Sequence, residues 1–239
     1  MKKQQTKKLK ITETVHGYKM DEPDDRDDVL GAVSGPIVLP SGNWRAIQLP
    51  EEFQATRGFE NYGCVTFTIL NAYEKLAKVV FGEDWNKSER FTYIDSDTDP
   101  TGGNSPRAVA DSVRHSGIID EVDLPYDDFI NTIEKFNSPK PLPTQLLDRG
   151  KEFLNSYDFR YSFLQATNGV ITRETMREAL KRSPVAIAVY AWAERDGVYI
   201  RPEGMTDTHL TLLENVKENG ELEVFDSYAP ANKTLDKDF

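Results

Sequence analysis

Three residue types in this chain could together perform nucleophilic chemistry: a cysteine, a histidine and an aspartate. Cys64 is the single cysteine, His209 follows it by 145 residues, and Asp226 follows His209 by 17. A thiol attacks a carbonyl carbon as its thiolate, which a neighbouring imidazole can generate, and a carboxylate can orient that imidazole through its second nitrogen. The set predicts acyl-transfer chemistry without a metal or cofactor, provided that the fold brings the side chains together.

These residues also have structural interpretations. A lone cysteine can form neither an internal disulfide nor a cysteine zinc site, and on a helix it is more often a buried apolar side chain than a nucleophile. Of the other histidines, His16 lies in a polar segment where solvent would surround it, and His115 stands near a predicted helix end, where it would bond the last carbonyl groups. His209 is therefore the candidate general base.

The spacing of apolar side chains indicates which elements position these residues. After Cys64 they recur at three- and four-residue steps as far as Phe81, which predicts a buried helix with the thiol at its N-terminus, where backbone N–H groups favour an anion. Asn219-Gly220 between two apolar runs is a strong hairpin signal. The predicted helices cover 64–82, 106–117 and 172–182, and the predicted strands cover 184–192, 208–216 and 221–228.

The predicted hairpin sets the separation of His209 and Asp226. A two-residue loop pairs Leu213 with Asp226, so that the histidine and the aspartate share a face but lie four residues apart, roughly 13 Å along the strand. A longer loop or a bulge is needed to bring the carboxylate to the imidazole.

The chain divides into a polar arm and a folded domain. Residues 1–41 contain the acidic run 21–28 and are predicted to form an extended arm, which is a solvated tail, a pro-segment or a segment that docks a partner. Residues 42–239 are predicted to form one α+β domain, with a helical lobe at about 55–138 and an antiparallel β lobe at about 144–239. Alternate prolines at 137–143 mark the expected boundary between the lobes.

Composition narrows the function classes. The 239 residues are 38% hydrophobic, which is enough for a sizeable core, and the formal net charge of −11 repels nucleic acids and anionic membranes. The basic start is followed by polar residues and not by an apolar run, so the sequence predicts a soluble cytoplasmic protein without a signal peptide or a membrane span.

The order and spacing of these residues resemble the papain-like cysteine peptidases, in which a histidine and an asparagine follow the cysteine by roughly 130–150 residues. Around the thiol, Tyr-Gly-Cys-Val-Thr-Phe at 62–67 is similar to the family's Gly-x-Cys-Trp-Ala-Phe segment, with Val65 in place of the tryptophan. Other similar stretches are Gly102-Gly103 with the residues up to Tyr126, the strand 184–189, Asp207-Thr208-His209 and Asp226-Ser227-Tyr228.

This resemblance implies a two-lobed papain-like fold in which Cys64 and His209 face each other across a cleft and hydrolyse peptide bonds. It further implies that Asp226 orients the imidazole and that Tyr228 covers their hydrogen bond. Gly102 and Gly103 would offer backbone groups to an extended protein or peptide substrate. The family's oxyanion glutamine has two candidate counterparts here, Gln54, ten residues before the cysteine, and Asn61, three before it.

Other interpretations remain open at this point. Transglutaminases, arylamine acetyltransferases and small cell-wall amidases use the same residue order with far shorter cysteine-to-histidine distances, and a papain-like site could also act as an amidase or isopeptidase. The other class is a non-catalytic papain-like protein, for example a virion component or a subunit of a larger assembly. The Thr-Phe-Thr-Ile-Leu-Asn run after Cys64 looks more like the bacterial and bacteriophage members than the lysosomal ones.

Overall fold

The computed structural model describes residues 10–11, 17–25, 35–164 and 170–239, so the prediction for His16 lies outside the described part of the chain. Its helices are α1 (Cys64–Val80), α2 (Glu89–Asp95), α3 (Pro106–Ser116), α4 (Ile133–Phe136), α5 (Thr144–Leu154) and α6 (Arg173–Leu180), with short 3-10 helices at Trp44–Ala46 and Glu121–Asp123. No helix within the described ranges is long and apolar enough to span a bilayer.

One sheet contains all the strands of the described residues. They are β1 (Lys10–Ile11), β2 (Val185–Val189), β3 (Ala193–Arg195), β4 (Val198–Ile200), β5 (His209–Val216), β6 (Leu222–Phe225) and β7 (Asn232–Leu235), in the order β1-β3-β4-β7-β6-β5-β2. All neighbouring pairs are antiparallel except β4 with β7. The predicted α+β class and the helices and strands expected from periodicity are thereby confirmed.

Local sequence signals account for where the helices begin and end. The Ser105 side chain caps α3 by accepting from the Ala108 N–H, and Gly117, with φ of 76°, ends that helix. At α6 the predicted start is confirmed, because the Thr172 hydroxyl accepts from the Thr175 N–H.

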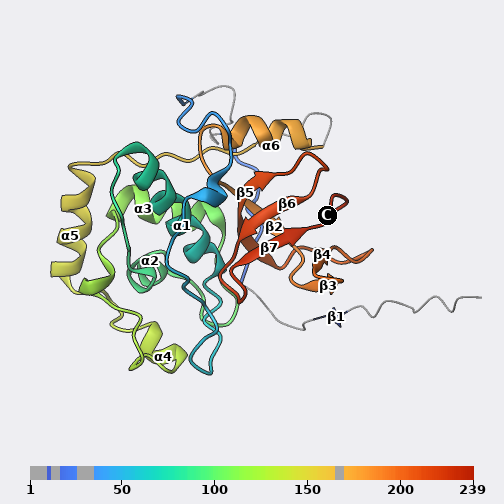
Figure 1. Cartoon of the computed structure of the whole chain (residues 1–239). Helices are drawn as coiled ribbons and strands as arrows, with labels where there is room; N and C mark the ends of the chain where they lie inside the picture. The colour runs from blue at the N-terminus through green and yellow to red at the C-terminus, as the bar shows by residue number, and fades with distance from the viewer. Residues whose placement is uncertain (1–9, 12–16, 26–34, 165–169) are drawn as a thin grey trace, which may run out of the picture.

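The two lobes meet along α1 and β5. Figure 1 shows α1 to α5 gathered on one side and the sheet on the other, with α6 close to β5. Between them, Lys75 of α1 and Glu214 of β5 form an ion pair of 2.7 Å in which each side chain is 1% exposed. The pair ties the helical lobe to the sheet because neither charge can be solvated without separating the lobes.

The boundary between the lobes lies later in the chain than the prolines at 137–143 indicate. The helix α5, which the sequence assigned to the β lobe, contacts α3. Its residues Phe153 and Leu154 pack against the apolar cluster that contains Cys64. Helix α5 therefore lies with the helical lobe, and the prolines form a turn within that lobe.

The register between β5 and β6 also differs from the prediction. The connection covers residues 217–221 instead of two residues, and the pairing shifts again just after Leu213, which lies opposite Val224. Continued along the strands, this register puts Asp226 two residues from His209 on the same face, where the two-residue loop had put it four residues away. The shift supplies the bulge that the contact between these side chains requires.

Candidate active site

Cys64 is the first residue of α1, and its side chain is fully buried. Burial raises the pKa of the thiol, and the negative charges of Asp226 and Glu60 act in the same direction. A hydrogen bond from the Leu210 backbone, at the start of β5, opposes that shift. The thiol is therefore neutral in this arrangement, although it sits at a helix N-terminus and against the strand that begins with His209.

His209 and Asp226 meet as the sequence predicted. The imidazole Nε2 lies 2.5 Å from Asp226 Oδ1, and both side chains are buried. The imidazole ring packs against two aromatic side chains, with its centroid 5.5 Å from that of Trp192 and 5.2 Å from that of Tyr228. The expected place of Tyr228 beside the histidine is thus what the structure has. His115, by contrast, lies at the end of α3 with Nδ1 2.8 Å from the Asp111 carbonyl, as expected of a structural histidine.

Lys233 is a member of this cluster that the sequence did not indicate. Its ammonium group lies 2.6 Å from Asp226 Oδ2, and the lysine is 2% exposed. Burial tends to raise the pKa of Asp226, but His209 and Lys233 together hold it below its ordinary value. Lysine is rarely buried, so its place in a charged C-terminal segment carried no signal for this contact.

Gln54 joins the cluster through a network of polar side chains. Its amide nitrogen donates to Glu60 Oε1 and to the Tyr228 hydroxyl, each at 2.8 Å, and its amide oxygen accepts from the Ser227 hydroxyl at 2.6 Å. Glu60 also accepts from the Tyr62 N–H at 2.8 Å and from the Tyr228 hydroxyl. Both amide hydrogens of Gln54 are therefore engaged by this carboxylate and phenol.

Asn61, the other oxyanion candidate, bonds the backbone just before the thiol. Its side-chain oxygen accepts from the Gly63 N–H at 2.8 Å, which fixes the backbone immediately before Cys64. Its side-chain nitrogen is buried and has no hydrogen-bond partner among the described residues.

The predicted glycines lie beside the N-terminal arm. The Asn104 N–H donates to the Gly17 carbonyl at 2.9 Å, and the Lys19 N–H donates to the Asn104 carbonyl at 2.9 Å, in a parallel bridge. A Cβ on Gly103 would lie 1.8 Å from the Gly17 carbonyl oxygen, so only glycine permits this approach. Gly102 lies at the same turn, where a Cβ would come within 2.8 Å of Asp99.

The same part of the arm contacts the opposite wall. The Tyr18 N–H donates to the carbonyl of Thr208, the residue before His209, at 3.3 Å. Its side chain packs against the cluster that contains Cys64, and burial, followed by the charges of Asp207, Asp21 and Cys64, raises the pKa of the phenol. The arm therefore passes over the thiol, bonded to the helical lobe on one side and to the sheet on the other.

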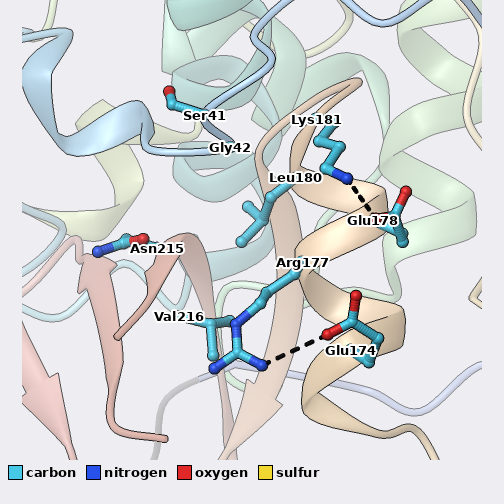
Figure 2. A pocket seen from close by; sticks show the side chains of 9 residues that line it. All are labelled: Ser41, Gly42, Glu174, Arg177, Glu178, Leu180, Lys181, Asn215 and Val216. Atoms are coloured by element: carbon cyan, nitrogen blue, oxygen red, sulfur yellow. Dashed lines mark hydrogen bonds and ion pairs between the residues drawn. The ribbon is translucent and has the colours of Figure 1, made fainter. Parts of the chain in front are cut away.

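A separate hollow lies between α6, the end of β5 and Gly42, as Figure 2 shows. Its charged side chains form ion pairs with each other, Arg177 with Glu174 at 3.6 Å and Lys181 with Glu178. It contains none of the candidate catalytic residues. Within the described ranges, no group of three or more His, Cys, Asp or Glu side chains is placed to hold a metal ion.

Comparison with known proteins gives matches of fold. No family model and no curated protein matches the sequence. Xylellain, a cysteine protease from Xylella fastidiosa, has a TM-score of 0.62 at 14% identity over 96% of this chain and 92% of that chain. Digestive procathepsin L 3 of Tenebrio molitor larval midgut has a TM-score of 0.57 at 14% identity, over 84% of this chain and 66% of that one. The Carica candamarcensis cysteine protease CMS1MS2, solved in complex with E-64, has a TM-score of 0.53 at 19% identity, over 81% and 86% of the two chains.

The protein therefore has the fold of the papain-like cysteine proteases, as the sequence predicted. At 14–19% identity the likeness concerns the arrangement of the backbone and not the roles of individual side chains.

Proposed function

We propose that this protein is a cysteine peptidase that hydrolyses peptide bonds of a protein or peptide substrate. The buried hydrogen bond between His209 Nε2 and Asp226 Oδ1 supports this proposal most directly, because it orients the imidazole at the start of β5, the strand whose Leu210 backbone bonds the Cys64 thiol. A structural histidine needs no such carboxylate. Burying both groups costs desolvation free energy, so we take their pairing as a sign of function.

In this mechanism the Cys64 thiol transfers its proton to His209, and the thiolate attacks the carbonyl carbon of the substrate. The carbon–nitrogen bond then breaks, and the imidazolium returns its proton to the leaving amine. Water, deprotonated by the imidazole, releases the acid from the thioester and regenerates the thiol. Asp226 keeps the ring in place and balances the charge of the imidazolium.

The oxyanion of the tetrahedral intermediate would be bound by the Cys64 N–H and by the Gln54 amide. Support comes from the present partner of that amide, since Gln54 already donates to a carboxylate oxygen of Glu60, and an oxyanion is a similar acceptor. The oxyanion would replace Glu60 as that acceptor. Asn61 is instead assigned to fixing the backbone at Gly63.

The arm acts as a pro-segment in this proposal. Gly17 to Lys19 bond the backbone on both walls, at Asn104 and at Thr208, where an extended substrate would have to lie to reach the thiol. With the arm in place Cys64 is fully buried, and burial keeps its thiol protonated. Displacement of the arm would expose the thiol and remove the main cause of its raised pKa.

The decisive experiment is capture of Cys64 by E-64, followed by hydrolysis of a peptide library, in full-length protein with a displaced arm. Stoichiometric capture that is lost in Cys64→Ser and strongly slowed in His209→Ala supports the peptidase. If Cys64 reacts no faster than an ordinary thiol and His209→Ala changes nothing, the protein is a non-catalytic papain-like module.

That module is the second candidate, and the raised pKa of the Cys64 thiol is the observation that favours it. It would serve as a binding or structural subunit of a larger assembly, such as a phage virion. For either candidate, the Thr-Phe-Thr-Ile-Leu-Asn run after Cys64, which resembles the bacterial and bacteriophage members, is the reason to propose a bacterial or phage type of protein working in a cytoplasm.

A further inference from the structure

Asp226 is held from both sides by buried basic residues. His209 Nε2 bonds Oδ1 at 2.5 Å and Lys233 Nζ bonds Oδ2 at 2.6 Å, and all three side chains are at most 1% exposed. The lysine also donates to the carbonyls of Tyr228 and Pro230, so its three ammonium hydrogens have three acceptors.

Aromatic rings surround the same ammonium group. Lys233 Nζ lies 5.2 Å from the ring centroid of Trp192 and 5.7 Å from that of Tyr199. Trp192 is also the ring that packs against His209. The lysine is thus fixed in position relative to the imidazole, with little freedom to move away.

The remaining ionisable groups around His209 come from several elements. The thiol of Cys64 comes from α1, Tyr228 from the turn after β6, Tyr199 from β4 and Tyr18 from the arm, while Glu60 and Asp207 act on these groups from adjacent loops. Among the described residues that act on this cluster, the Asp226 carboxylate bonds the imidazole, and the Lys233 ammonium group bonds that carboxylate.

We propose that Lys233 is a positioning residue that acts through Asp226 to limit how strongly His209 holds a proton. The inference rests on the proposed function, in which His209 must both accept and return a proton. A buried carboxylate alone would stabilise the imidazolium strongly and make it a poor acid for the leaving amine. Lys233 cancels part of the field of Asp226, which weakens the binding of a proton by the imidazole. It also keeps Asp226 ionised, so the proton in the bond between Nε2 and Oδ1 stays on the imidazole and is not shared with the carboxylate.

The test is the titration of the His209 ring, followed by NMR in the full-length protein. Its signal is assigned by its loss in His209→Gln. In Lys233→Met the ring should bind its proton at least about tenfold more tightly, because the opposing cation is gone. In Lys233→Met with Asp226→Asn, where both charges are removed together, the midpoint should return to within about threefold of the wild type.

Two further variants keep the test decisive. Lys233→Gln retains a donor to the carboxylate without the charge, so it should shift the midpoint in the same direction as Lys233→Met even if the methionine variant folds poorly. Lys217→Met removes a partly exposed lysine that pairs with Glu221 at 3.1 Å in the β5–β6 connection, and it should leave the midpoint unchanged. A midpoint that is the same in folded Lys233→Gln and in the wild type overturns the proposal.

The NMR titration does not depend on catalysis, so its failure is distinguishable from failure of the peptidase proposal, which E-64 capture tests separately. Where the thiol is reactive, a second readout applies. In a plot of the alkylation rate of Cys64 against pH, the alkaline limb should move to higher pH in Lys233→Gln, because the imidazolium then loses its proton at a higher pH. An unchanged limb contradicts the role of Lys233 even though the enzyme is active.

Discussion

Replacing Gly17 by valine should displace the arm from the thiol. A Cβ at Gly17 would lie 2.1 Å from the Tyr62 carbonyl oxygen, and the backbone there has φ of +86°, which a β-branched residue avoids. The overlap has little room to be relieved, because the backbone of Gly17 is also packed closely against Gly103. The segment from Gly17 to Lys19 must therefore leave both walls.

The magnitude follows from the bonds that are lost. Three backbone hydrogen bonds connect this segment to the two walls, two at Asn104 and one at Thr208. At about 0.5–1.5 kcal/mol net for each, their loss favours the open arm by about 2–4 kcal/mol, which is a factor of about 30 to 1,000 in the open fraction. The second-order rate at which a thiol reagent modifies Cys64 should increase by a similar factor as long as the arm opens and closes faster than the reagent reacts.

The assay is the second-order rate of Cys64 modification by iodoacetamide and by E-64, measured on full-length protein by mass spectrometry. Gly35→Val is a matched control, because Gly35 also precedes the folded domain and a Cβ there meets no atom within 4 Å. Its rate should equal that of the wild type. If folded Gly17→Val reacts at the wild-type rate, the arm does not control access to the thiol and the pro-segment reasoning is wrong.

Three further predictions concern stability and turnover. Lys75→Met leaves the buried Glu214 unpaired and should lower the free energy of unfolding in urea by about 3–5 kcal/mol, whereas adding Glu214→Leu should recover most of the loss. Burial raises the pKa of Glu74 from 4.5 to about 8, so the folded protein keeps this carboxyl protonated where the unfolded chain ionises it. The free energy of unfolding should therefore fall by up to about 5 kcal/mol as the pH rises from 4.5 to about 8. In Glu74→Gln, urea titrations should show a free energy of unfolding that changes less with pH. With the arm displaced, Gln54→Ala should lower kcat by about 10²–10³ with little change in KM. Asn61→Ala should mainly lower the melting temperature. Equal kcat values for the two variants would contradict the oxyanion assignment.

The sequence indicated the elements near the site because local signals define them. The apolar spacing after Cys64, the predicted positions of α3 and α6 and the apolar strands around His209 all correspond to what the structure contains. These signals act within a few residues along the chain, so they can be recognised without knowledge of the tertiary packing.

Other features depend on tertiary packing and left no local signal. The register between β5 and β6 is set by a bulge near Leu213, which brings Asp226 within reach of the imidazole. Lys233 and Glu60 are charged residues that the sequence pattern places in solvent, yet Lys233 is buried and Glu60 bonds Gln54 and Tyr228. The burial of such charged residues can be predicted only when the partners that neutralise them are known.

The turn between β6 and β7 has a consequence for the order in which the protein assembles. Asp226 and Lys233 are seven residues apart and lie on either side of this turn, at the ends of paired strands. A loop this short closes with little loss of chain entropy, and hairpins form within about 1–10 μs. The carboxylate can therefore meet the ammonium group before either is removed from water, and β5 can bring the histidine to a charge that is already neutralised. The acidic member of the site can thus enter the core as half of a pair that has already formed, which avoids burying a lone ion during folding.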